Sequence, residues 1–429
     1  MKKKIIWLGL LCLMHGFIGC VEEFDAQINE LETALVVDAR LTNELRPQTV
    51  LLSNTFDFDA IDPNPETGAE VVLVDDLNNT TDFIEDSPGV YTSANALQLT
   101  QGRTYTLQIT RTDGSRFLST PQELPSETTI AAITPTRVIN NSGLEGVSIV
   151  LDVEGNSANT GPDYYRYEYL ETTKIIAPDF NPFSWDEIDY DFFCEDDDGW
   201  DVTIAARQEP AKVCFASSNS NDLILASTEE LVTNNLEGFE VRFLSRENYY
   251  IAHRYSILVK QYHLDAEAAS FYQILSDFSN NESVFSNVQT GLIEGNINAE
   301  NTDDLVLGYF ELSSYSEKRV FFNYTDLFPD EELPPYVINC EFASEPPLYP
   351  EGFHATEIDG KIVIDGTSNS PLIDGILAGL IGYHDTNENY QVLDADGEPD
   401  RAPFVVKPLG CVDCREFGSN VPPEFWIEE

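Results

Sequence analysis

Lysine and arginine are scarce in this sequence, which holds 23 of them against 75 aspartate and glutamate residues, for a formal net charge of -52. So acidic a surface repels phosphates and anionic headgroups, which argues against nucleic acid or a bare anionic membrane as a partner. Cations and basic protein surfaces remain as possible partners. Disorder is not indicated, because 42% of the residues are hydrophobic and 11% are aromatic. The 429 residues allow two or three domains.

Apolar runs long enough for a transmembrane helix, roughly 20 residues, are also missing. The apolar run from Ile5 to Ile18 follows three lysines and is typical of an export signal. Gly19 before Cys20 favours the lipoprotein form, in which residues 1–19 are removed and Cys20 becomes an acylated N-terminus. The acyl chains would anchor the protein at about 0.8 kcal/mol per buried methylene. The alternative is ordinary signal cleavage with an incidental Cys20.

Sequence motifs of catalysis are absent. There is no GxSxG, and the histidines of the mature chain form no recognisable constellation with a nucleophile. A glycosidase needs only two carboxylates, but among 75 acidic residues their existence decides nothing. We therefore expect a protein that is not an enzyme.

Five cysteines remain once Cys12 leaves with the signal and Cys20 is acylated, and disulfides persist in an exported chain. A bond between Cys194 and Cys214 would close a local loop. The odd count leaves one thiol over, and spacing does not settle the pairing. The five disulfide candidates are Cys194, Cys214, Cys340, Cys411 and Cys414.

The spacing C-V-D-C at residues 411–414 also suits redox chemistry or half of a zinc site. Cys340 could pair with either of these cysteines, or join them and a histidine (His354 or His384) around zinc. Pro408 and Gly410 precede the motif and no βαβ pattern surrounds it, which disfavours a thioredoxin-like role. We favour a disulfide.

Short runs rich in Val, Leu, Thr, Phe and Tyr dominate residues 34–124, after an acidic tether at residues 20–33. The run at residues 104–110 alternates strictly, with Tyr105, Leu107 and Ile109 on one face, as in a half-buried antiparallel strand. Turn clusters separate the runs and helical periodicity is missing. We predict an all-β chain whose first domain is an Ig-like or transthyretin-like β-sandwich.

A larger β-rich domain is expected over residues 125–429, after a linker at residues 121–127. An acidic, aromatic insertion interrupts it at residues 176–201, and its C-terminal part is rich in loops. One short helix is predicted from Asp265 to Phe278, because Ala269, Tyr272 and Leu275 share a helical face and Asp265 suits the N-cap.

Two oxygen-rich stretches are candidates for calcium, which prefers six to eight oxygen ligands. The first crowds five carboxylates into residues 195–201, without the spacing of an EF-hand. The second has the opening of such a loop, but Tyr390 stands where glycine is needed. A solvated surface loop is the simpler interpretation of both. The ligands of the second stretch would be Asp385, Asn387, Asn389, Asp394 and Asp396.

Aromatic side chains interleave with acids in the insertion. Exposed aromatics are costly unless they dock, and they dominate interface energetics, so these residues are candidates for a partner interface. The alternative is that they fold back over the second domain. The candidates are Phe183, Trp185, Tyr190 and Trp200.

The run YSILVKQYHLDAEAASFYQILSDF, then VLGYFELSSYSEKRVFF and CVDCREFGSNVPPEFW, resembles the domain-of-unknown-function 4249 family, lipoproteins of Bacteroidota often encoded beside TonB-dependent receptors. ALVVDARLT and GRTYTLQITRTDGSRFLS match its opening domain. The resemblance covers roughly Leu35 to Trp426, except for the insertion and the segment at about 365–401. The family has no established catalytic residues.

This resemblance implies a cell-surface lipoprotein of the outer membrane that serves nutrient uptake as a ligand-binding or lid subunit of a TonB-dependent transporter. The acidic residues Glu22, Glu23 and Asp25 after the lipidated cysteine fit surface display, and the periplasmic face is the other possibility. The alternatives are a lipid-anchored hydrolase of glycans or peptides and a calcium-dependent structural or adhesive surface protein.

Overall fold

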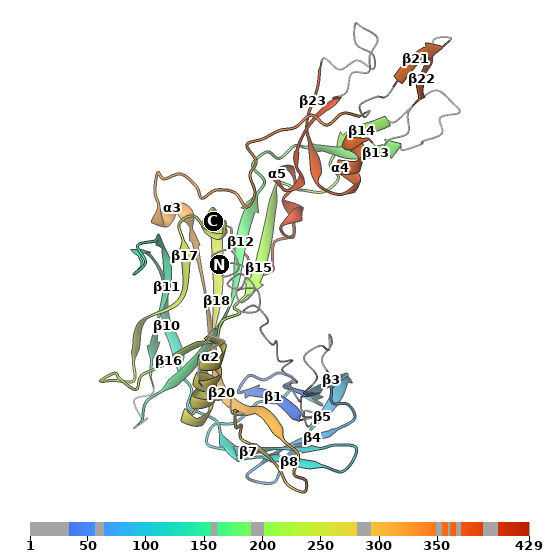
Figure 1. Cartoon of the computed structure of the whole chain (residues 1–429). Coiled ribbons are helices and arrows are strands. Elements are labelled where there is room, and N and C mark those ends of the chain that lie inside the picture. The colour runs from blue at the N-terminus through green and yellow to red at the C-terminus, as the bar shows by residue number, and fades with distance from the viewer. Residues whose placement is uncertain are drawn as a thin grey trace, which may run out of the picture.

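The computed structural model describes residues 34–55, 64–155, 161–189, 201–280, 293–348, 354–358, 361–365, 370–388 and 402–428. They form an N-terminal β-sandwich, a central pair of sheets and a distal body at the far end of the central sheets (Figure 1). The all-β prediction is confirmed. The proposed signal, Cys20 and the tether lie outside the described residues.

The N-terminal sandwich forms because its strands alternate apolar and polar residues. In β7, Tyr105, Leu107 and Ile109 are buried while their neighbours are only partly covered, as predicted. Burying such a side chain contributes about 1.5–3 kcal/mol. The strands are β1 (Leu35–Thr42), β2 (Thr49–Asn54), β3 (Asn64–Pro65), β4 (Glu70–Asp75), β5 (Thr80–Ser87), β6 (Val90–Ser93), β7 (Thr104–Thr110), β8 (Arg116–Ser119) and β9 (Gln122–Glu123).

The chain returns to this sandwich much later. Strand β19 (Ile297–Ala299) pairs with β8, and the first half of β20 (Val306–Asn323) runs parallel to β1. Ile297, Phe310 and Leu312 complete the sandwich's apolar core. The second half of β20 pairs with β18 (Arg254–Leu264) of the central sheets. A single strand therefore belongs to both domains, so residues 297–313 join the sandwich built on residues 34–124.

The central region packs the sheet β10–β11–β17 against β12, β18 and β20. Its core combines aliphatic residues of the first sheet with tyrosines of the second, such as Tyr167 and Tyr255. Its other elements are β10 (Thr129–Ile139), β11 (Glu145–Glu154), β12 (Tyr164–Ile176), β15 (Val213–Asn219), β16 (Ile224–Ser227), β17 (Leu236–Ser245), a 3-10 turn η2 (Tyr249–Ile251), α2 (Ala266–Asn280) and α3 (Tyr324–Leu327).

Strands β12 and β15 lead into the distal body, where the insertion meets the C-terminal part of the chain (Figure 1). Hairpin β13–β14 packs there on α4 and β23–β24. The distal elements are β13 (Phe183–Asp189), β14 (Asp201–Ala206), β21 (His354–Ile358), β22 (Lys361–Asp365), α4 (Pro371–Leu377), β23 (Ile381–Thr386), β24 (Phe404–Pro408), α5 (Leu409–Val412) and a 3-10 turn η3 (Cys414–Glu416).

The expected helix is present as α2, and the backbone N–H of Ala268 donates to Asp265 Oδ1 at 2.7 Å, which confirms the cap. The expectation of one short helix is wrong, because α3, α4 and α5 are helical too. Helix α4 has its own start signal: Ser370 accepts a hydrogen bond from the N–H of Ile373, and Pro371 opens the first turn.

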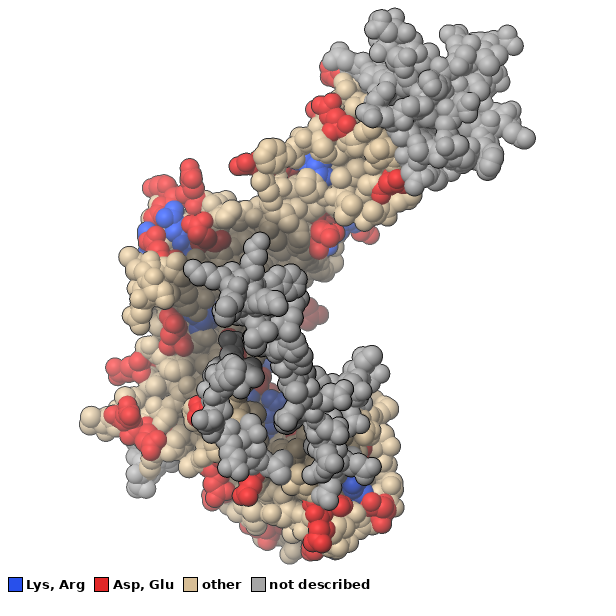
Figure 2. Space-filling model, in the orientation of Figure 1, with Lys and Arg blue, Asp and Glu red and all other residues tan. Residues whose placement is uncertain are grey.

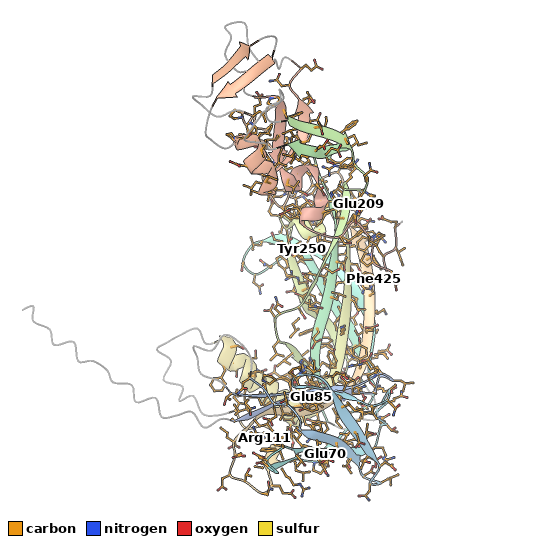
Figure 3. The ribbon with its side chains drawn as sticks, turned by 90° about the vertical axis from the view of Figure 1, so that its right-hand side faces the viewer. Glu70, Glu85, Arg111, Glu209, Tyr250 and Phe425 are labelled. Carbon is orange, nitrogen blue, oxygen red and sulfur yellow. A yellow bond between two sulfur atoms is a disulfide. The ribbon has the colours of Figure 1, made fainter. Side chains whose placement is uncertain are left out.

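The last residues of the chain cross the outer face of the central sheet. Trp426 packs edge-on against Phe215 of β15 and Phe321 of β20. The guanidinium of Arg319 lies 3.6 Å from the ring centre of Phe425, which Figure 3 labels on this face. The C-terminal segment thus ties two strands of the sheet together.

Candidate functional site

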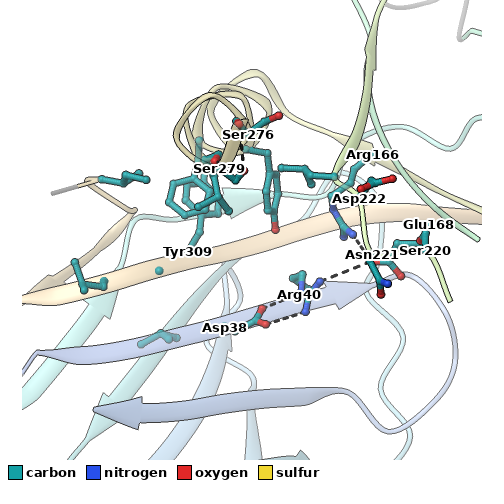
Figure 4. Close-up of a pocket in the computed structure, with 18 of the residues that line it drawn as sticks. Asp38, Arg40, Arg166, Glu168, Ser220, Asn221, Asp222, Ser276, Ser279 and Tyr309 are labelled. Carbon is teal, nitrogen blue, oxygen red and sulfur yellow. Dashed lines mark hydrogen bonds and ion pairs between the residues drawn. The ribbon is translucent and has the colours of Figure 1, made fainter. Parts of the chain in front are cut away.

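A groove of about 1100 Å³ lies where the N-terminal sandwich meets the central sheets (Figure 4). Both domains contribute to it, together with helix α2 and the loop after β15. Its lining comprises Val36, Val37, Asp38 and Arg40 of β1, Arg166, Tyr167 and Glu168 of β12, Ser220, Asn221, Asp222 and Leu223 of the loop, Phe271, Tyr272, Leu275, Ser276 and Ser279 of α2, Ile293, and Leu307, Gly308 and Tyr309 of β20.

Helix α2 forms one wall because its apolar face docks on β20. Ala268 and Tyr272 are buried there, and the ring of Phe271 stacks on Tyr309 with the ring centres 4.8 Å apart. Leu275 and Ser276 lie along the edge that lines the groove, and Leu275 stays 40% exposed. Packing of the helix therefore leaves a ridge of side chains above the strands.

The floor depends on a close approach between β20 and β1. Gly308 has φ +99°, a conformation that favours glycine, and a Cβ there would lie 1.9 Å from the carbonyl oxygen of Val37. Glycine is required at this position.

Behind the groove lies a buried ion pair that joins the domains. Arg166 Nη2 lies 3.0 Å and 3.3 Å from the two carboxylate oxygens of Glu311, and the side chains are 3% and 0% exposed. The hydroxyl of Tyr272 donates to Glu311 at 2.5 Å. Burial opposes ionisation of Glu311, but Arg166 and Tyr272 outweigh it and hold the pKa of this carboxyl below its usual value. Burial and the nearby Glu311 charge raise the pKa of Tyr272, so its hydroxyl stays protonated.

A second set of charges lies at the rim. Asp38 accepts two hydrogen bonds from Arg40, at 2.8 Å each. Arg40 also lies 3.7 Å from Glu168, which pairs with Arg166 at 2.5 Å and accepts a hydrogen bond from Tyr262 at 3.2 Å. The two guanidiniums are thus already matched by carboxylates of the protein.

Two buried donors beside the groove have no hydrogen-bond partner among the described residues. They are Nε of Arg166 and the hydroxyl of Tyr309. Burial raises the pKa of Tyr309, so this hydroxyl is a neutral donor. Unmatched buried donors each cost about 1–3 kcal/mol, which marks this junction as locally unfavourable for stability.

The described aromatic residues of the insertion differ in exposure, with Trp185 packed onto the distal body and Phe183 facing solvent. Trp185 folds back onto the distal body, edge-on to Tyr383 and Phe404 at 5.6 and 5.3 Å, and its Nε1 donates to the carbonyl of Ile381. Phe183 of the same hairpin is 45% exposed. Trp185, partly buried, therefore packs against the core of the distal body and does not stand out as an interface anchor. Tyr190 and Trp200 lie outside the described residues.

The disulfide of Cys214 joins it to a distant part of the chain and not to the neighbouring cysteine in the sequence, Cys194. Cys214 of β15 is bonded to Cys414, which corrects the suggested Cys194–Cys214 loop. Both cysteines of the C-V-D-C motif form disulfides, as favoured, though not with each other. Cys340 is bonded to Cys411, one of the two partners considered, which also removes it from any zinc site. The reason is that η3 lies against β15, where Phe215 and Ser419 exchange backbone hydrogen bonds. Cys194 lies outside the described residues.

The calcium candidates gain no support. Within the part of the chain that the structure describes, no three His, Cys, Asp or Glu side chains are grouped to hold a metal ion. Asp385 accepts the backbone N–H of Thr386, and the amide of Asn387 donates to the carbonyl of Ala402. Asn389, Asp394, Asp396 and the acidic run at 195–198 lie outside the described residues.

Among the described residues, no helix combines the length and the hydrophobicity that crossing a membrane would take.

None of the groove residues was predicted from the sequence to belong to a binding site, although Tyr272 and Leu275 were named for the face of the predicted helix. A signal existed: Arg166 and Glu311 each interrupt an otherwise strand-forming run, in YYRYEYL and GYFELSS. Charges of opposite sign in the middle of two strands are rarely buried unless they pair. Which two charges meet depends on strand order, however, and β12 and β20 are separated by β18.

Comparison with known proteins gives a family but no activity. No curated protein matches the chain. A structure of a DUF4785 family protein from Legionella pneumophila is 9% identical, with a TM-score of 0.17, and covers 53% of this chain. The chain spans about half of that protein, 52%, and the likeness is too slight to argue from. The model of a domain of unknown function, DUF4249, matches residues 21–319. The chain belongs to the DUF4249 family.

Proposed function

We propose that this protein is a non-catalytic binding subunit, anchored to the outer membrane through Cys20 and displayed at the cell surface, where it serves a TonB-dependent transporter in nutrient uptake. The groove between the two domains carries this proposal. At about 1100 Å³ it lies just above the usual range for small-molecule sites, about 300–1,000 Å³, and it combines apolar walls with a few charged groups.

The electrostatics of the groove favour binding over bond cleavage. A general acid needs a pKa near the working pH, usually through burial without a compensating cation. The pKa of Glu311 is instead held low by Arg166, and Glu168 is shared between Arg40 and Arg166. These carboxylates serve the cohesion of the junction.

The tether would supply the rest of the mechanism. Acyl chains confine the protein to the membrane plane and so raise its effective concentration near a transporter in the same membrane. The acidic surface, spread over all three bodies in Figure 2, keeps the body of the protein away from anionic headgroups.

Affinity purification from gently solubilised outer membranes tests the proposal. We expect the full-length chain to carry fatty acid and to co-elute with an outer-membrane transporter. The variant Cys20→Ser should appear in the soluble fraction without that partner, and Cys12→Ser, in the same signal, is the matched control. Protease added to intact cells should degrade the protein if it is displayed at the surface.

A fatty-acid-free, soluble protein that hydrolyses glycans or peptides by itself would overturn the proposal. Collapse of thermal stability in chelator, without a transporter partner, would point to a calcium-dependent structural protein.

A further inference from the structure

The groove has an apolar surface of branched aliphatic side chains, which narrows the class of ligand. Five such side chains in its lining are at least partly exposed, and Leu275 is the most exposed of them, at 40%, whereas Val37 is buried in the sandwich core. They come from β1, α2, β20 and two loops, so apolar surface is contributed by every part of the groove wall. The five are Val36, Leu223, Leu275, Ile293 and Leu307.

The aromatic residues of the groove are buried or stacked on one another, so their faces are not open to a ligand. Tyr272 and Tyr309 are buried, at 8% and 6% exposure, and Phe271 is stacked face to face on Tyr309. Sugar rings are recognised largely by stacking on exposed aromatic faces. A groove whose aromatic faces are covered and whose open surface is aliphatic suits hydrocarbon side chains better than a glycan.

The charges of the groove favour a cationic ligand. Asp38, Glu168, Asp222 and, behind Arg166, Glu311 supply four carboxylates against the two guanidiniums of Arg40 and Arg166, a formal excess of two negative charges. The side chain of Asp38 is 43% exposed even with Arg40 bound to it. Asp222 is exposed, and no ion pair joins it to a residue that the structure describes. The net charge of -52 adds long-range attraction for cations.

Polar side chains also line the groove. Ser220 and Asn221 lie at the central-domain end of the groove, and Ser276 lies along the helix. Spaced amides and carbonyls of an extended peptide match such a lining, because its side chains and its backbone groups alternate along the chain.

We propose that the groove binds a free oligopeptide in extended form, with aliphatic side chains against α2 and β20 and a lysine or arginine beside Asp38 and Asp222. This inference rests on the proposed function, since it names the ligand of the same binding subunit.

Titration of the full-length protein with a fluorescent hexapeptide of alternating leucine and lysine tests the proposal, with the leucine–glutamate hexapeptide as the reversed-charge probe. We expect saturable binding of the first and at least about tenfold weaker binding of the second. Raising the salt from about 0.05 M to about 0.5 M should weaken binding, because the charges near the groove mouth are screened.

Variants locate the site. Asp222→Asn should weaken binding about two- to fivefold, as expected for one exposed charge pair, and Leu275→Ser about fivefold through lost apolar contact. Asp82→Asn and Leu77→Ser change an exposed acid and an exposed leucine on the N-terminal sandwich away from the groove, and should leave binding unchanged.

Equal binding of both peptides, no binding of either, or equal loss in groove and control variants would overturn the proposal. If the protein nevertheless co-purifies with a transporter, the proposed function stands and only the ligand class falls. If the peptide binds but no transporter is recovered, the peptide site stands and the proposed role beside a transporter falls.

Discussion

Removing one partner of the buried pair between Arg166 and Glu311 should destabilise the protein far more than replacing both. In Glu311→Leu, the guanidinium of Arg166 stays buried at 3% exposure and loses the carboxylate that lies 3.0 Å away. The hydroxyl of Tyr272 loses its acceptor as well. Glu168 remains on the other side of Arg166, so one of its two carboxylate partners is kept.

The expected magnitude follows from these contacts. Breaking a buried ion pair on one side costs about 3–5 kcal/mol, because a charge is left without compensation. The double variant Arg166→Met, Glu311→Leu fills the same space with apolar atoms, and such replacements are often neutral or stabilising. We expect it to lose at most about 1 kcal/mol, with a coupling energy of at least about 2 kcal/mol between the two positions.

Urea unfolding followed by far-ultraviolet circular dichroism measures the free energies of all four proteins of this cycle. Wild type and the double variant should have similar midpoints, and each single variant a clearly lower one. If Glu311→Leu costs under about 1 kcal/mol, or if the two single losses simply add in the double variant, the reasoning about this pair is wrong.

The acid side of the stability profile should depend on Glu311. Its pKa is lowered in the folded state, so its contribution to the free energy of unfolding is fully present above the ordinary pKa of about 4.3 and is lost as the pH falls through the folded pKa. Glu311→Gln should flatten this part of a plot of stability against pH. Trp185→Ala should cost about 3–5 kcal/mol in the distal body, seen as faster proteolysis there, while Phe183→Ala on the same hairpin stays within about 0.5 kcal/mol. Gly308→Ala should destabilise the junction by about 1–3 kcal/mol, measured by urea unfolding, because its φ is +99° and its Cβ would meet β1. Cys414→Ser should lower the melting temperature by opening a 200-residue loop, and a thermal scan of the wild type in reductant should show at least that loss, because Cys340–Cys411 opens as well.

Much of the fold was accessible from local patterns. Alternation in β7 and the cap of α2 are written in neighbouring residues, and both were predicted correctly. Helix α4 was missed because it is only seven residues long and its apolar run contains Gly375, Gly379 and Gly382, although Ser370 and Pro371 give a start signal. Short helices that tertiary packing stabilises leave little periodicity to read.

The groove and the disulfides could not be derived from the sequence, because both depend on which distant strands become neighbours. Cys214 and Cys414 are 200 residues apart, and Arg166 and Glu311 are 145 apart. Trp185 shows the same limit. Its acidic sequence neighbours suggested an exposed interface residue, and its packing partners, Tyr383 and Phe404, lie about 200 residues away in the sequence.

The double membership of β20 has a mechanical consequence. Tension that enters the chain at residue 34 pulls on β1, whose eight residue pairs with β20 lie side by side in parallel. Pulling along such a pair loads its hydrogen bonds together instead of opening them one by one. The second half of β20 is paired with β18, so the force passes directly into the central sheets. The two domains would therefore stay together under tension and not separate at the junction.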